Sequence, residues 1–229
     1  MKNISILLLF LVSFSIYAFD VEGGKWEHLY SKRKLDFYSK EVKGSGILAF
    51  SAKGTIKISL LEMLAIVRNV EGTKRWDKNS SVKKTIRDIS DIEADTYSVS
   101  KMPWPVTNRD LVLNNKLRLD LENNFMIVDS YSIKNKDYPK HDDRVRAKMR
   151  IARFKIRPAS KGRTYIEMYI HIDPKGSIPN WMVNFVQKDL PYDYLRSLEK
   201  FSKTVDEKPK PGVLKLYKEF MKHYKNVSK

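Results

Sequence analysis

Cysteine is absent from all 229 residues of the chain. This excludes disulfide bonds, thiol nucleophiles and cysteine metal ligands, so the fold must be stabilised by its core alone. Histidine is scarce and scattered, and His171 and Asp173 lie on one face of a predicted strand, two residues apart. Two ligands are too few for a metal site, and such a pair is also typical of the polar face of a strand. We expect no metal and no other cofactor.

Motifs of the common enzyme classes are missing as well. The chain has no glycine-rich phosphate loop, no Gly-x-Ser-x-Gly turn and no carboxylate pair at a telling spacing. Without a set of groups that could act together in a reaction, we expect the protein not to be an enzyme.

The longest apolar run lies at the N-terminus. Lys2 precedes an apolar stretch from Ile4 to Ile16, and Ala18 is a suitable residue before a cleavage site. The stretch is shorter than the roughly 20 residues that span a bilayer. It therefore predicts a signal peptide over residues 1–18, and a periplasmic or secreted protein. The rest divides into a domain over residues 19–205 and a basic C-terminal extension over residues 206–229.

The charge is strongly basic, with 44 Lys and Arg against 27 Asp and Glu and a net charge of +17. Such a surface favours anionic partners, which include nucleic acid, anionic lipid head groups and polyanionic sugars. Export argues against nucleic acid. Two interpretations stay open: a specific anionic partner, such as an anionic membrane surface, or a charge that only keeps the protein soluble.

Apolar periodicity predicts an α+β fold. A short helix is expected over residues 26–30, followed by strands over 34–42 and 47–58 and a helix over 59–70 that Ser59 caps. Residues 82–173 alternate mostly as strands of an antiparallel sheet. The apolar phase shifts by one residue between Ile151 and Ala152, which indicates a bulge or bend.

Helices are predicted to close the chain. A long helix is expected from about Pro179 to Phe201, with Pro191 kinking or breaking it, because proline removes a helix hydrogen bond. After a linker over residues 208–211, an amphipathic helix over 213–224 carries lysines around an apolar face. Two alternatives stay open. Either the apolar face packs on the domain and the lysines are only solvated, or the lysine-rich face rests on an anionic membrane.

Four segments carry a family resemblance. They are Trp76-Asp77 after the first long helix, residues 103–110 (PWPVTNRD), Val145-Arg146, and residues 173–181 (DPKGSIPNW) before the C-terminal helix. Their order and spacing resemble the START family, lipid-transfer domains related to the steroidogenic acute regulatory protein. The resemblance runs from about Trp26 to Phe201, so the last helix lies outside it.

The resemblance implies a helix-grip fold, in which a curved antiparallel β-sheet wraps around a long C-terminal α-helix and encloses a tunnel for one lipid, such as a sterol or a phospholipid. It implies a carrier without catalytic activity, which we expect to be a monomer. The C-terminal helix would act as a lid beside the loops near Thr107 and Gly176. The candidate ligand-binding residues are Arg109, Arg146, Met149, Met168, Ile170, Trp181, Met182, Phe185 and Val186.

Several alternatives stay open. The apolar stripes could fill a solid core and leave no cavity. Arg109 and Arg146 could each form a structural ion pair, because a buried arginine needs a partner. The protein could also be a helix-grip enzyme that acts on a hydrophobic substrate, or a polyanion-binding surface protein, whose binding moderate salt would weaken.

Overall fold

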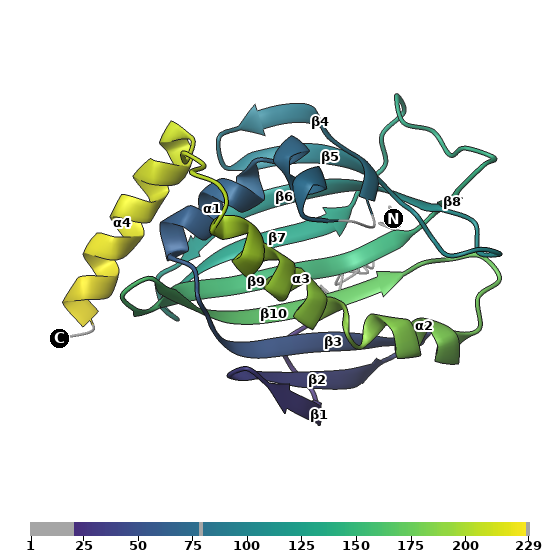
Figure 1. The fold of residues 1–229 in the computed structure, drawn as a ribbon, viewed down its shortest axis with the longest axis horizontal. Helices are drawn as coiled ribbons and strands as arrows, with labels where there is room; N and C mark the ends of the chain where they lie inside the picture. Colours follow the sequence, from purple (N-terminus) through teal and green to yellow (C-terminus); the bar gives the residue numbers. More distant parts are fainter. Residues whose placement is uncertain (1–20, 78–79, 228–229) are drawn as a thin grey trace, which may run out of the picture.

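The computed structural model describes residues 21–77 and 80–227, so the predicted signal peptide lies outside the described residues. A single large sheet with helices on one face makes up this part of the chain (Figure 1). The elements in chain order are β1 (Glu27–Lys32), β2 (Leu35–Val42), β3 (Ser45–Ile56), α1 (Leu60–Arg68), the 3-10 helix η1 (Glu71–Arg75), β4 (Ser80–Ser90), β5 (Glu93–Ser100), β6 (Arg109–Asp120), β7 (Phe125–Ser132), β8 (Val145–Arg146), β9 (Lys148–Ser160), β10 (Arg163–Asp173), α2 (Asn180–Gln187), α3 (Leu190–Ser202) and α4 (Pro211–Val227).

The strands follow the spatial order β1-β2-β3-β10-β9-β7-β6-β5-β4, and all neighbours on this path are antiparallel. The short β8 pairs in parallel with the start of β6. The first three strands therefore join the sheet through the last one, β10. This long-range join is also held by the Thr164 hydroxyl, which donates to the Ile58 carbonyl 106 residues away at 2.8 Å.

The face of the sheet that carries the helices, called the inner face here, contains the core. On β9 and β10 the residues Ile156, Ile166 and Met168 are buried in this core. The predicted bulge is present, because the register between β9 and β10 shifts there: His171 lies opposite Ile151, and the next residue, Ile172, lies opposite Met149. The predicted curved antiparallel sheet closed by a C-terminal helix is thereby confirmed.

Helix α1 begins where the sequence predicts it. Ser59 has extended backbone dihedral angles, and its hydroxyl accepts a hydrogen bond from the Glu62 amide at 3.4 Å. This cap satisfies one of the amides that the first turn leaves unpaired. The buried face of α1 includes Met63 and Ile66, which pack into the core.

The predicted long helix over residues 179–201 is two helices. Helix α2 ends at Gln187, and α3 begins at Leu190 with Pro191 in its first turn. Proline lacks the amide that an uninterrupted helix needs, but it is well suited to the first turn of a new one. The chain therefore breaks where Pro191 requires it. Of the two pieces, α3 is the one that crosses the inner face, where Leu195 and Leu198 are fully buried (Figure 1).

The last helix, α4, packs on the domain. Val213 and Phe220 are buried, and Leu216 and Tyr217 pack against the same core. Helix α4 contacts α1 and β6 at one end of the sheet (Figure 1). Of the two alternatives for its apolar face, the structure therefore contains the packed one.

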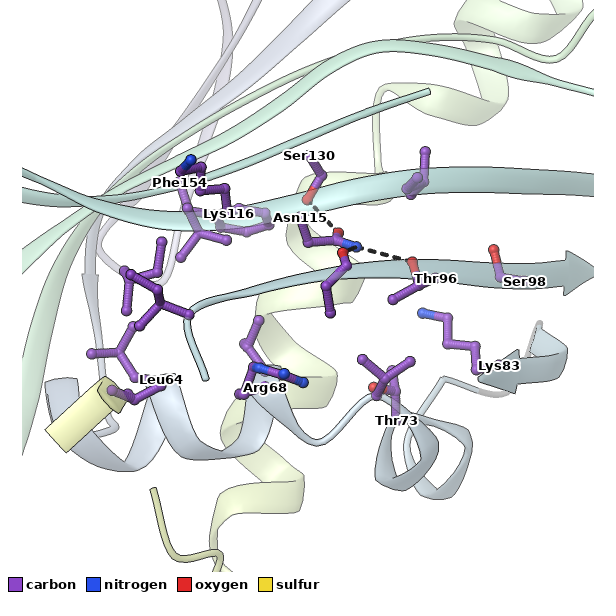
Figure 2. A pocket seen from close by; sticks show the side chains of 18 of the residues that line it. Leu64, Arg68, Thr73, Lys83, Thr96, Ser98, Asn115, Lys116, Ser130 and Phe154 are labelled. Atoms are coloured by element: carbon purple, nitrogen blue, oxygen red, sulfur yellow. Dashed lines mark hydrogen bonds between the residues drawn. The ribbon is translucent and has the colours of Figure 1, made fainter. Parts of the chain in front are cut away.

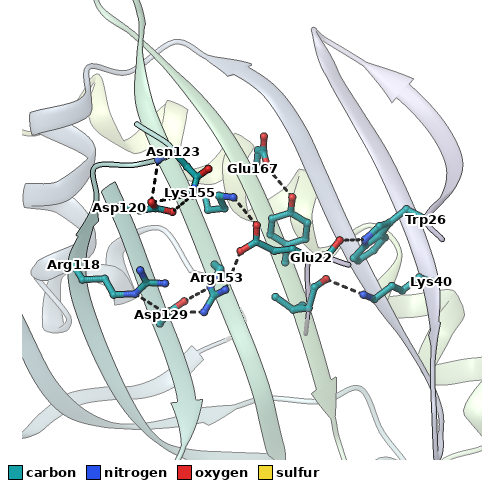
Figure 3. A network of polar contacts seen from close by, with 12 residues as sticks. Glu22, Trp26, Lys40, Arg118, Asp120, Asn123, Asp129, Arg153, Lys155 and Glu167 are labelled. Atoms are coloured by element: carbon teal, nitrogen blue, oxygen red, sulfur yellow. Dashed lines mark hydrogen bonds and ion pairs between the residues drawn. The ribbon is translucent and has the colours of Figure 1, made fainter. Parts of the chain in front are cut away.

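The chain start was predicted wrongly. Residues 26–30, expected as a helix, belong mostly to the edge strand β1. The segment before it crosses the outer face of the sheet, opposite the helices (Figure 3). There Glu22 accepts hydrogen bonds from Arg153 at 2.9 Å and Lys155 at 2.5 Å, and Lys40 donates to the Val21 carbonyl at 3.0 Å.

Candidate functional site

A cavity of about 170 Å³ lies between helix α1 and the inner face of β4 to β7. Helix α1 and η1 form one wall, the strands form the opposite wall, and α3 and α4 contribute single residues (Figure 2). The lining residues are Leu64, Val67, Arg68, Val70, Thr73, Lys83, Ile92, Ala94, Thr96, Tyr97, Ser98, Leu113, Asn115, Lys116, Leu117, Val128, Ser130, Phe154, Tyr194 and Val213.

Most of this wall is apolar. Leu64 and Val67 of α1 face Leu117 and Val128 of the sheet across the cavity, and Val213 of α4 closes it. A void with such walls favours an apolar occupant over water. The core is therefore solid over β9 and β10 but open over β4 to β7, so both sequence interpretations apply, each to one half of the sheet.

A polar cluster interrupts the apolar wall on the strands. The Asn115 amide donates to the Thr96 hydroxyl at 3.0 Å and to the Ala94 carbonyl at 3.2 Å. The Ser130 hydroxyl donates in turn to the Asn115 side-chain oxygen at 2.7 Å (Figure 2). Three neighbouring strands, β5, β6 and β7, thus present one connected group of neutral polar side chains to the cavity.

Aromatic side chains lie beside the cavity on α3 and at the end of η1. Burial raises the pKa of the Tyr194 phenol well above its ordinary value, so Tyr194 is neutral. Its ring meets the ring of Trp76 edge-on, with centroids 5.2 Å apart. The indole nitrogen of Trp76 is buried and has no hydrogen-bond partner among the described residues. The Trp76-Asp77 motif thus packs next to the cavity wall.

Arg109 and Arg146 lie at one end of the sheet and do not line the cavity. Arg109 donates hydrogen bonds to the carbonyls of Thr107, Pro174 and Lys175, so it ties the loop before β6 to the loop before α2. Arg146 forms an ion pair with Asp110 at 2.7 Å. The structure therefore contains the ion pair of Arg146 that the sequence left as an alternative, and lipid contacts of both arginines stay predictions.

The other candidate ligand residues also lie outside the cavity lining. Met168 is buried in the core, and Met149 and Ile170 pack against it. The remaining candidates lie on α2 and are exposed to solvent. They are Trp181, Met182, Phe185 and Val186. Contacts between these residues and a lipid stay predictions.

Helix α2 is attached to the sheet by its polar side. The Asn184 side chain accepts from the Leu48 amide at 2.9 Å and donates to the Gly46 carbonyl at 3.2 Å. Gln187 donates to the Ile172 carbonyl at 2.9 Å. Val183 is buried on this attached side, whereas Trp181 and Phe185 point outward and are 69% and 64% exposed.

Trp104, between its two prolines, is another exposed aromatic residue at this end. It is 93% exposed in the loop between β5 and β6. Since Arg109 binds the carbonyls of the loop before α2, this Trp104 loop and α2 lie at the same end of the sheet. The proline-flanked segment is therefore a turn that presents one large ring to the solvent.

The polar cavity residues Thr96, Asn115 and Ser130 were missed in the sequence. A signal was available in Asn114-Asn115, because asparagine is depleted in strands and this pair interrupts an apolar strand. The pattern alone does not say which core-facing residues border a void, because that depends on how α1 packs over β4 to β7.

Other site types find little support in the described part of the chain. Residues 21–77 and 80–227 contain no group of three or more metal-ligating side chains. Within the same ranges, no helix has the length and apolarity to cross a membrane. A second hollow of about 470 Å³ lies at the surface between β1 and α3, where Lys32, Lys188, Asp189 and Asp193 border it. Its charged walls do not suit an apolar ligand.

Comparisons with known proteins identify the fold and the family. The family model described as START domain matches residues 16–208. Phosphatidylcholine transfer protein of Bos taurus is 25% identical over 183 residues, which cover 79% of this chain and 85% of that protein. The crystal structure of human STARD10 superposes with a TM-score of 0.69 at 23% identity and covers 77% of this chain and 72% of that one. A STAR-related lipid transfer protein from Xanthomonas axonopodis superposes with a TM-score of 0.68 at 21% identity, over 78% of this chain and 98% of that chain.

Proposed function

This chain belongs to the START domain family, and from that premise we propose that it is a lipid carrier. It binds a single lipid or other hydrophobic ligand in the cavity between α1 and β4 to β7. It carries this ligand between membranes and does not catalyse a reaction. The observation that carries the proposal is the apolar cavity itself, enclosed by α1, α3 and α4 over the inner face of the sheet. Each Å² of apolar ligand surface removed from water there stabilises the complex by roughly 25 cal/mol.

The size of the cavity requires movement when a lipid binds. Ligand pockets for molecules of drug size usually measure about 300–1,000 Å³, whereas this cavity measures about 170 Å³. A lipid therefore enters only if a helix moves away from the sheet. Helix α1 forms the wall opposite the strands, and α3 follows the break at Pro191, so these two helices form the gate in this proposal.

The outer side of α2 is the proposed contact with the membrane. Helix α2 docks through Asn184, Gln187 and the buried Val183, and it leaves two large aromatic side chains, Trp181 and Phe185, exposed to solvent. The ammonium group of Lys188 lies 4.5 Å from the centre of the Phe185 ring, so charge and aromatic surface occur together there. Indole rings and lysines both favour the interface of a bilayer that carries anionic lipids.

Two further parts of the proposal concern the environment. Residues 1–18 are proposed as a signal peptide, which makes the protein periplasmic or secreted. We also propose that it works as a monomer. The competing enzyme interpretation gains no support from His171 and Asp173, because the ring of His171 is buried against the Ile47 carbonyl and Asp173 forms an ion pair with Lys175 at 2.7 Å.

The experiment is a native mass spectrum of the protein purified from its own host, followed by organic extraction and identification of the lipid. One lipid per protein, retained through a high-salt wash, would support the proposal and name the cargo. A bare protein that also takes up no lipid from vesicles would overturn it. Salt-sensitive binding of nucleic acid or sulfated polysaccharide would then favour the polyanion-binding alternative.

A further inference from the structure

We propose that the cavity selects a lipid whose polar end is uncharged and carries a hydroxyl group, and that it discriminates against phosphate head groups. The proposal rests on the proposed function, because it names the class of ligand for the same cavity. Two independent observations carry it: the hydrogen-bonding capacity left over in the polar cluster, and the pairing of every cation that borders the cavity.

The polar cluster follows from the strand register. Asn115 of β6 lies opposite Ala94 of β5 on one side and opposite Ser130 of β7 on the other. Thr96 and Ser98 follow Ala94 at alternate positions of β5, so their side chains share its face of the sheet. All five residues line the cavity (Figure 2). The polar groups therefore lie side by side across three strands.

Hydrogen-bond accounting shows what this cluster can still bind. The two amide protons of Asn115 are used, one on Thr96 and one on the Ala94 carbonyl, and its oxygen accepts from Ser130. The Thr96 hydroxyl accepts in that network, and it donates its own proton to no acceptor among the described residues. The Ser98 hydroxyl forms no hydrogen bond within the same ranges. Since a hydroxyl also has two acceptor lone pairs, the cluster offers donors and acceptors together, as another hydroxyl group requires.

Each cation that borders the cavity already has an anionic partner. Lys83 binds Asp77 at 3.0 Å, and Lys116 binds Glu93 at 2.9 Å. Arg68 pairs with Asp88, a carboxylate that it shares with Lys210, and it also donates to the Asp91 and Ser90 carbonyls at 2.9 and 3.0 Å.

A phosphate in the cavity would have to break one of these three ion pairs or stay uncompensated beside apolar walls, where an unpaired charge is strongly disfavoured. A neutral hydroxyl group requires neither. Long-chain alcohols, sterols and diacylglycerols share this chemistry, and the test uses diacylglycerol as the probe.

Selectivity is tested by mixing the full-length protein with vesicles of phosphatidylcholine and phosphatidylglycerol that contain a small fraction of diacylglycerol. The protein is then separated from the vesicles, and its lipid is extracted and measured. We expect diacylglycerol to be enriched severalfold on the protein relative to the vesicles. Phospholipid bound in proportion to the vesicles, or in excess, would overturn this inference but leave the lipid-carrier function standing. No bound lipid of any kind would contradict the proposed function itself.

The polar cluster is tested with Thr96→Val, which keeps the shape of the side chain and removes the hydroxyl. We expect its affinity for diacylglycerol to fall roughly three- to tenfold, as for the loss of one buried hydrogen bond. Affinity for the acetyl ester of the same diacylglycerol, which lacks the hydroxyl, should change less than twofold. An equal loss for both lipids would mean that Thr96 only shapes the cavity and would overturn its assigned role.

The matched control is Thr55→Val, the same change on the other face of the sheet. Thr55 lies on β3 next to the buried residue Ile56, and its side chain does not line the cavity. Both variants should melt within a few degrees of the unmodified protein, so a binding difference between them reports on the cavity. If Thr55→Val weakened diacylglycerol binding as much as Thr96→Val, the inference would be contradicted.

Discussion

Asp110 and Arg146 are joined by a two-point ion pair, in which Arg146 Nε lies 2.7 Å from Asp110 Oδ1 and Nη2 lies 3.0 Å from Oδ2. The carboxylate is completely buried and also accepts from the Tyr97 hydroxyl at 3.1 Å. The pair fastens β8 to the start of β6, directly after the loop that presents Trp104. Its position indicates that it holds this end of the sheet in shape.

Removing the cation from this pair should destabilise the protein strongly. Arg146→Ala leaves the buried carboxylate of Asp110 without its partner, so we expect the free energy of unfolding to fall by about 3–5 kcal/mol. Arg146→Lys should recover part of the loss, because an ammonium group cannot form both bonds at once. Denaturant titration measures both values.

The control is Arg118→Ala, since Arg118 binds Asp129 at a more exposed site where Arg153 holds the same carboxylate (Figure 3). We expect a change below about 1 kcal/mol there. Similar losses in Arg146→Ala and Arg118→Ala would contradict the special role assigned to the buried pair.

The exposed side of α2 should be needed for exchange with membranes and not for stability. We expect the double variant Trp181→Ser, Phe185→Ser to transfer lipid between anionic vesicles at least tenfold more slowly, because it loses the apolar contact with the bilayer. Its melting temperature should stay the same or rise slightly. Transfer of a fluorescent lipid between donor and acceptor vesicles provides the rate.

Tyr131→Ser serves as the comparison, because Tyr131 is an exposed aromatic residue of β7 outside α2. This variant should transfer lipid at the normal rate. Normal transfer by the α2 double variant would show that the membrane contact lies elsewhere.

Helix α4 should contribute to the stability of the whole domain. Phe220 is fully buried against the core, so Phe220→Ala should lower the free energy of unfolding by about 3–5 kcal/mol, through lost apolar burial and the void left behind. The exposed neighbour Lys218 offers the contrasting variant Lys218→Ala, for which we expect less than about 0.5 kcal/mol. A Phe220→Ala protein of unchanged stability would mean that α4 folds independently of the domain.

Acid should weaken the fold through His171. Burial lowers the pKa of this imidazole below its ordinary value of about 6.5, with Arg150 acting in the same direction and the Ile47 carbonyl and Asp173 opposing it. The unfolded chain therefore binds a proton at this residue as pH falls below about 6.5, and the folded chain resists it. Stability should fall with decreasing pH from about 6.5 down to the lowered pKa, by at most about 1.4 kcal/mol per pH unit.

The histidine variants separate this effect from general acid sensitivity. His171→Gln retains a donor for the Ile47 carbonyl and removes the titration, so the slope of stability against pH between about 6.5 and 5 should become shallower. His141→Gln, at an exposed loop position, should leave the slope unchanged. If both variants keep the original slope, another group is responsible.

Local sequence signals predicted the elements that depend on local physics. The Ser59 cap, the alternation along β9 and β10, and the helix break at Pro191 all rest on neighbouring residues, and the structure confirms them. Strand β1 was mistaken for a helix, because most of its side chains are exposed and its strand conformation depends on pairing with β2.

The position of the cavity could not be predicted from the sequence, for a related reason. Alternation identifies the residues that face the core, including Met168 and Ile170, but not where the core is incomplete. The void forms because α1, reached from β3, covers β4 to β7 less tightly than α3 covers β9 and β10. Only the packing of helices on the sheet determines this difference, so Thr96 and Asn115 could not be singled out by periodicity.

The join between β3 and β10 has a consequence for the order in which the chain can assemble. Strands β1 to β3 leave the ribosome first, yet their neighbour in the sheet is the last strand, β10. Bringing β3 and β10 together costs loop-closure entropy before any contact between them compensates for it. Contacts of such sequence separation make folding slow. The sheet of the newly made chain can therefore close only after β10 is complete, so until then the edge of β3 that β10 will cover is open to other strands.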